Sequence, residues 1–135
     1  MTDQVIFTGP LSEGELSWWY RRADIFALAS DAQWRQDRLW TEGFGMVLLE
    51  AAARGLPCLA GNAGGVPDAV GDGAGGILLP PRDQAAWLAA LEDLAGDPGK
   101  RKALGEKARA WALAGHTWEH RRLEFHRHLV ENYRI

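Results

Sequence analysis

Short apolar runs alternate with helix-like segments along most of this chain. Four runs are rich in aliphatic or aromatic side chains and are bounded mostly by Gly, Pro or Ser: 5–9 (VIFTG), 25–29 (IFALA), 57–60 (PCLA) and 76–79 (GILL). None of them alternates strictly between apolar and polar residues, which is typical of strands buried on both faces. The pattern predicts an α/β fold, with a parallel sheet of about four strands flanked by helices.

The segments between and after these runs have helical composition or spacing. They cover residues 12–23, 45–54, 66–70, 83–95, 98–114 and 118–133. Ser12 and Glu15 form the S-x-x-E pattern of a capping box, in which each side chain bonds the backbone amide of the other residue. Trp18, Trp19 and Tyr20 are expected to pack the first helix onto the sheet.

The stretch from Ser30 to Gly43 has neither pattern and is expected to be a long loop that carries Trp34 and Trp40. Two interpretations of these rings stay open. They fold back over the core, which we favour because large rings usually fill cores. Alternatively, they form part of a rim that faces an acceptor or a lipid.

Residues 1–135 are expected to form one domain, with a core over 1–96 and C-terminal helices over 97–135. Ligands of parallel α/β sheets bind where the strands end. The loops after Gly9, Ala29, Ala60 and Leu79 therefore define the edge at which we expect chemistry.

Charge and cysteine content narrow the classes of function. The net charge of −3 gives no electrostatic case for binding nucleic acid. The basic excess lies in the last third, around residues 100–102 and 121–127, and indicates either a solvated helix face or weak attraction to anionic lipid. Cys58 is the only cysteine, which fits a reducing cytoplasm. We expect a cytoplasmic protein, with peripheral membrane contact as a further option.

The segment EGFGMVLLE contains the strongest candidate chemistry. Glu42 and Glu50 flank seven residues, and Gly43 and Gly45 allow the backbone to approach a ligand closely. Unpaired amides at the start of a helix form a ready site for a diphosphate. The two carboxylates would then accept hydrogen bonds from hydroxyls on either side of it. Glutamates near a helix start also occur simply because they favour the helix dipole. A glycosidase carboxylate pair is a third interpretation, which the intervening anion site disfavours.

This segment and its surroundings resemble a known family. E-G-F-G-x-x-x-x-E, followed by A-x-A-R-G-x-P, is similar to the E-x7-E signature of glycosyltransferase family 4, the group 1 glycosyltransferases of GT-B fold. The similarity continues through GNAGGVPD and GILLP and covers nearly the whole chain in order. The segments LEAAARGLP and AGNAGGVPDAV are similar to those of the mannosyltransferases that build phosphatidylinositol mannosides. Ala29 and Asp68 depart from the common Pro and Glu, which blurs the sugar preference.

The resemblance implies a Rossmann-like domain that takes part in retaining transfer of a hexose from a nucleoside-diphosphate sugar. It suggests GDP-mannose as the donor and requires no metal or other cofactor. Glu42 would be the catalytic-site residue that holds hydroxyls of the donor sugar, and Glu50 would hold the ribose. The other residues that it implies in donor binding are Gly9, Leu11, Ser30, Phe44, Gly45, Met46 and Val47, with Gly9 and Leu11 bordering the base.

The family's catalytic unit has two facing domains, and this sequence resembles only the C-terminal, donor-binding one. We therefore expect a partial domain that needs an N-terminal acceptor domain as its partner. The alternative is a non-catalytic module that binds a nucleotide sugar or a partner protein. A strand over residues 5–9 would lose its family neighbours, so it is expected either to pair beside residues 25–29 or to be exchanged in a homodimer.

Overall fold

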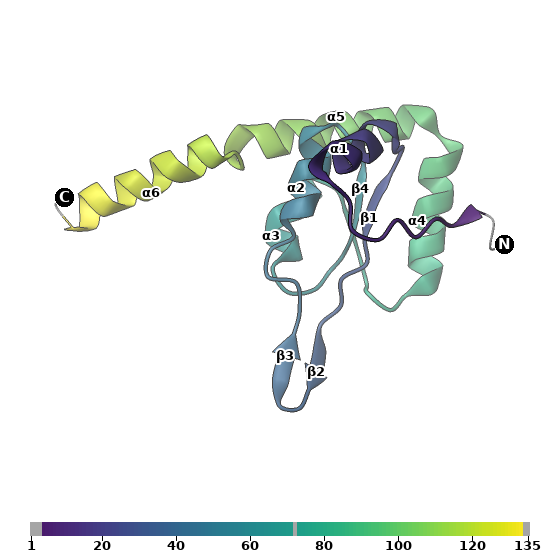
Figure 1. Ribbon diagram of the computed structural model, residues 1–135, viewed down its shortest axis with the longest axis horizontal. Helices are drawn as coiled ribbons and strands as arrows, with labels where there is room; N and C mark the ends of the chain where they lie inside the picture. The colour runs from purple at the N-terminus through teal and green to yellow at the C-terminus, as the bar shows by residue number, and fades with distance from the viewer. Residues whose placement is uncertain (1–3, 72, 134–135) are drawn as a thin grey trace.

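A parallel sheet forms the centre of the molecule. The computed structural model describes residues 4–71 and 73–133. Its sheet has the order β1-β4-β5, made of β1 (Phe26–Leu28), β4 (Cys58–Gly61) and β5 (Ile77–Leu79). In the parallel register, Leu59 of β4 lies between Ala27 and Ile77. The α/β class with a helix-flanked parallel sheet is therefore confirmed (Figure 1).

The strand expected over residues 5–9 does not form, so that prediction is wrong. Residues 5–9 have no strand assignment, and Phe7 is 94% exposed. In the part of the chain that the structure describes, β1 pairs with β4 alone, so this run does not pair beside residues 25–29 either. An apolar run becomes a strand only when another strand satisfies its backbone groups, and none lies beside it here.

Two hydrophobic clusters bury the two faces of the sheet. On one face, Cys58 and Ala60 of β4 pack with α1 (Glu13–Arg22), α2 (Met46–Ala53), α3 (Val66–Val70) and α5 (Pro98–Gly115). On the other face, Leu59 packs with Leu94 of α4 (Gln84–Gly96). Figure 1 shows α4 across the strands from α2 and α3. Burial of alternate β4 residues on opposite faces matches the expectation of a doubly covered sheet.

The N-terminal capping box is confirmed, but only one of three aromatic residues on α1 reaches the core. The Ser12 side chain accepts from the Glu15 amide, and the Glu15 carboxylate accepts from the Ser12 amide. Tyr20 is buried, whereas Trp18 and Trp19 are 46% and 37% exposed. Three consecutive helical residues point about 100° apart, so they cannot share one buried face.

The predicted loop of residues 30–43 contains a β-hairpin instead. Strands β2 (Gln33–Arg35) and β3 (Arg38–Trp40) pair antiparallel across a two-residue turn, at which Gln36 and Asp37 have φ of 47° and 60°. Two positive φ values in succession are typical of the tight turns that join hairpin strands. Trp34 is 73% and Trp40 61% exposed, so these rings do not fold over the core as we favoured. The hairpin projects from the body of the molecule (Figure 1).

The C-terminal helices have the expected extents. α5 adds Ala108 and Ala112 to the core, while α6 (Trp118–Tyr133) extends away from the body and has no buried residue among those described (Figure 1). Within the described residues, no helix combines the length and the apolarity that crossing a bilayer would require.

Candidate functional site

Glycines allow the loop of residues 61–65 to pack closely against the segment that leads into α2. Gly45 is the N-cap residue, with φ of 88°, a left-handed conformation that favours glycine. The loop of residues 61–65 packs directly against it, since a Cβ atom on Gly65 would lie 2.0 Å from the Gly43 carbonyl oxygen. The Gly65 amide donates to the Glu42 carbonyl oxygen at 3.1 Å. Only residues without side chains permit these backbone segments to lie so close together.

The amides at the start of α2 remain available. Within the described residues, the backbone amides of Met46 and Val47 have no hydrogen-bond partner. The first amides of a helix lack intrahelical partners and carry the positive end of its dipole. The start of α2 therefore presents two unpartnered amides, and their place between two glutamates of a donor site stays a prediction.

Glu42 lies on one side of these amides. Its carboxylate oxygen Oε1 accepts from the Phe44 amide at 3.5 Å, which turns the side chain back toward the helix start. With Ser30 and Trp40 it lines a cavity of about 360 Å³ at the base of the hairpin, which we call the small cavity. Asp31, Gln33 and Thr41 complete its lining.

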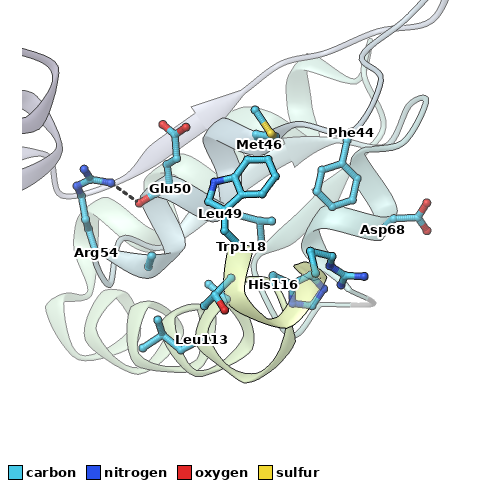
Figure 2. Close-up of a pocket in the computed structure, with 13 residues that line it drawn as sticks. Phe44, Met46, Leu49, Glu50, Arg54, Asp68, Leu113, His116 and Trp118 are labelled. Atoms are coloured by element: carbon cyan, nitrogen blue, oxygen red, sulfur yellow. Dashed lines mark hydrogen bonds between the residues drawn. The ribbon is translucent and has the colours of Figure 1, made fainter. Parts of the chain in front are cut away.

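Glu50 lies on α2, one to two turns after the Gly45 N-cap. Its Oε2 atom accepts a hydrogen bond of 3.2 Å from the Tyr20 hydroxyl. Its backbone carbonyl accepts one of 2.9 Å from Nη1 of Arg54 (Figure 2). The Arg54 guanidinium also lies 4.6 Å from the centre of the Tyr20 ring. Burial, and then the negative charge of Glu50, raise the pKa of Tyr20 to about 12. The phenol therefore stays a neutral donor to the carboxylate at ordinary pH.

A larger pocket of about 680 Å³ lies beside Glu50, between α2 and the junction of α5 with α6. Its apolar walls come from Phe44, Met46, Leu49, Leu113 and Trp118, and its charged side chains are Glu50, Arg54, Asp68 and Arg121. Figure 2 shows Trp118 lying over the face of α2 that bears Leu49, with Phe44 beyond it. Apolar walls with a few charged groups are typical of sites for small organic ligands.

The structure does not bring all the predicted site residues together in one place. Phe44, Met46 and Glu50 line the large pocket, with the exposed Val47 next along α2, and Ser30 and Glu42 line the small cavity. Gly45 lines neither of them and is the N-cap residue at the start of α2. Leu11 lies apart, in a separate pocket of about 390 Å³ with Ile6, Thr8 and Trp19, and follows Gly9 in the exposed N-terminal segment. That these two residues border a base stays a prediction.

Several side chains at the site were not predicted from the sequence, namely Tyr20, Arg54, Trp118 and Arg121. Only Arg54 carried a local signal, because it follows Glu50 by four residues on the same helix face. The others reach the site through packing between distant elements.

Comparison with known proteins identifies the family. The family described as "Glycosyl transferases group 1" matches residues 1–111. The chain belongs to the group 1 glycosyltransferases. It is 37% identical over 121 residues to a GDP-mannose-dependent alpha-(1-6)-phosphatidylinositol monomannoside mannosyltransferase of Mycolicibacterium smegmatis, a match that covers 90% of this chain and 31% of that protein.

Two further proteins are similar over most of the chain. A D-inositol 3-phosphate glycosyltransferase of Streptomyces bingchenggensis is 38% identical over 108 residues, which cover 80% of this chain and 22% of that protein. Among solved structures, sucrose-phosphate synthase from Thermosynechococcus elongatus superposes with a TM-score of 0.76 at 28% identity, over 96% of this chain and 31% of that one. This group 1 glycosyltransferase chain thus spans about a third or less of the length of these relatives.

Proposed function

We propose that this chain binds the donor, a nucleoside-diphosphate hexose, for a retaining glycosyl transfer, and that the donor is GDP-mannose. The observation that supports it most is that the amides of Met46 and Val47 are unpartnered at the start of α2, which lies between Glu42 and Glu50 in the chain, while the two carboxylates line separate cavities. Such amides attract a diphosphate, and ionised carboxylates accept hydrogen bonds from hydroxyls. Two relatives named for GDP-mannose-dependent transfer support the choice of sugar and base.

The two carboxylates would serve opposite ends of the donor. Glu50 faces the large pocket, whose apolar walls suit a nucleoside, and its Oε1 atom accepts no hydrogen bond from the described residues. Glu42 faces the small cavity, where Ser30 and Thr41 add further polar groups suited to a sugar. We propose that the diphosphate spans the helix start between them, with Gly45 permitting its close approach. No step in this arrangement calls for a metal or another cofactor.

Isothermal titration calorimetry tests the proposal with GDP, GDP-mannose, UDP and UDP-glucose. We expect Glu50→Gln to weaken GDP and GDP-mannose alike, by about tenfold or more, because a hydrogen bond to a charged acceptor contributes about 1.5–3 kcal/mol. Glu42→Gln should weaken only the nucleotide sugar. Glu92→Gln, on the exposed face of α4, is the matched control and should change neither. Failure of every nucleotide to bind, or full binding by Glu50→Gln, would contradict the proposal.

Transfer itself is a separate question, because the chain spans only 31% of its mannosyltransferase relative. We propose that an acceptor domain supplied by a partner or by a longer protein completes the enzyme. The chain alone would then act as a nucleotide-sugar-binding module without turnover. Steady release of GDP from GDP-mannose by the chain alone would contradict this part of the proposal.

A further inference from the structure

The β2–β3 hairpin presents its two tryptophans on opposite faces. The register pairs Gln33 with Trp40 and Trp34 with Leu39. Successive side chains of a strand point to opposite faces, so Trp40 shares a face with Gln33 and Trp34 shares the other with Leu39. The lining of the small cavity agrees, since it contains Trp40 and Gln33 and neither Trp34 nor Leu39. The exposed indole of Trp40 therefore faces the small cavity, and that of Trp34 faces away from it.

The side of the cavity formed by β3 is anchored next to Glu42. Trp40 precedes Glu42 by two residues, and both side chains line the cavity. Thr41 and Glu42 are fixed by the glycine loop, because a Cβ atom on Gly64 would lie 2.2 Å from the Glu42 carbonyl oxygen. The backbone next to Trp40 is therefore held in place, and the Trp40 indole lines the same cavity as the Glu42 carboxylate.

On the opposite side of the cavity, Asp31 is bonded to Arg82, which lies in the turn between β5 and α4. Nε of Arg82 donates to Oδ2 of Asp31 at 2.9 Å, and the Ala32 amide donates to Oδ1 of the same carboxylate at 2.8 Å. The hydrogen bond from Arg82 lowers the pKa of Asp31. Asp31 is therefore a charged acceptor at neutral pH, facing a cavity that also contains the indole.

An aromatic ring, carboxylates and hydroxyls around one cavity match the chemistry of a sugar ring. A pyranose presents C–H groups on its faces and hydroxyls around its edge, so an indole can cover a face while acceptors bind the edge. The cavity, at about 360 Å³, has a size typical of small-ligand sites.

We infer that Trp40 is a sugar-binding residue, whose indole covers one face of the donor hexose while the hexose hydroxyls reach Glu42. This inference rests on the proposed donor-binding function and assigns part of its sugar specificity to the hairpin. Trp40 distinguishes a nucleotide sugar from the bare nucleotide, and Trp34 takes no part.

The test compares Trp40→Ala with Trp34→Ala in the full chain. Each variant is titrated with whichever pair the unmodified chain binds more tightly, GDP with GDP-mannose or UDP with UDP-glucose. We expect Trp40→Ala to weaken the nucleotide sugar about tenfold and to leave the nucleotide unchanged. Trp40→Phe should restore most of the loss, and Trp34→Ala should change neither affinity.

The outcomes separate this inference from the function on which it rests. Nucleotide binding with an unchanged affinity ratio in Trp40→Ala would overturn the role of Trp40 and leave the donor site standing. No nucleotide binding at all would overturn both. Equal losses of the nucleotide sugar in both alanine variants would also overturn the inference. So would a Trp40 effect seen only in sedimentation with phosphatidylglycerol vesicles, since it would assign the hairpin to a membrane surface.

Discussion

The hydroxyl of Tyr20 donates a hydrogen bond of 3.2 Å to Oε2 of Glu50 and so joins α1 to α2 at the proposed donor site. The phenol is only 6% exposed, and its ring lies 5.8 Å from that of Phe26. A buried ring therefore positions an exposed carboxylate, so that its second oxygen is oriented before a ligand arrives. Preorganisation of this kind reduces the entropy that binding must overcome.

Removing the Tyr20 hydroxyl should affect both stability and binding. Tyr20→Phe keeps the ring and its contact with Arg54 but loses the bond to Glu50. We expect a loss of about 1 kcal/mol in the free energy of unfolding and a several-fold weaker affinity for GDP. Urea unfolding and calorimetry measure the two effects. Tyr133→Phe, at an exposed position on α6, is the control, and unchanged GDP affinity in Tyr20→Phe would show that Glu50 needs no such support.

Stability should fall at high pH. Burial raises the pKa of Cys58 from 9.0 to about 12, and burial with the nearby Glu50 charge raises that of Tyr20 from 10.0 to about 12. The folded chain then holds protons that the unfolded chain has lost, so the contribution of these groups is complete below pH 9 and is lost as pH rises toward 12. We expect the urea midpoint to decline above pH 9 and the decline above pH 10 to be shallower in Tyr20→Phe. Parallel profiles for the two proteins would contradict the role of Tyr20.

The Cys58 thiol should be unreactive in the native chain. It is fully buried in the core cluster of β4 and α2, and the raised pKa leaves almost no thiolate at neutral pH. A thiol reagent such as Ellman's reagent should therefore modify it slowly under native conditions and rapidly in urea, to one thiol per chain. Fast modification of the folded protein would indicate that this part of the core opens readily.

The glycine contact behind the helix start should not tolerate a side chain. In Gly65→Ala the new Cβ would lie 2.0 Å from the Gly43 carbonyl oxygen, a backbone atom that cannot simply rotate away. We expect a loss of about 1–3 kcal/mol in stability, together with weaker binding of GDP. Gly96→Ala, where nothing lies within 4 Å, is the matched control for thermal unfolding. Equal melting temperatures for the two variants would contradict the packing described here.

The exposed N-terminal run predicts self-association. Val5, Ile6 and Phe7 are 59%, 72% and 94% exposed, and β1 offers one unpaired edge within the described residues. Homodimer formation by exchange of this run stays a prediction. Sedimentation analysis should find a dimer that Phe7→Asp weakens, with Asp24→Asn as a control for a change of charge. A monomer at all concentrations would rule out the exchange.

The sequence alone determined the features that depend on neighbours along the chain. The Ser12–Glu15 capping box, the start of α2 after Gly45 and the central strand around Leu59 follow from local pattern, because caps, helical periodicity and buried apolar runs involve contacts within a few residues. The same local pattern located Glu42 and Glu50 on either side of the helix start.

Tertiary structure alone decided the rest. Residues 5–9 have a strand's composition but form no strand, because backbone pairing needs a partner from elsewhere in the chain. Tyr20 meets Glu50, thirty residues later, only because α1 packs beside α2. Trp40 rather than Trp34 faces the small cavity because of how the hairpin lies against the rest of the molecule. A one-dimensional pattern indicates which side chains prefer burial, but the packing of helices, sheet and hairpin determines which of them meet.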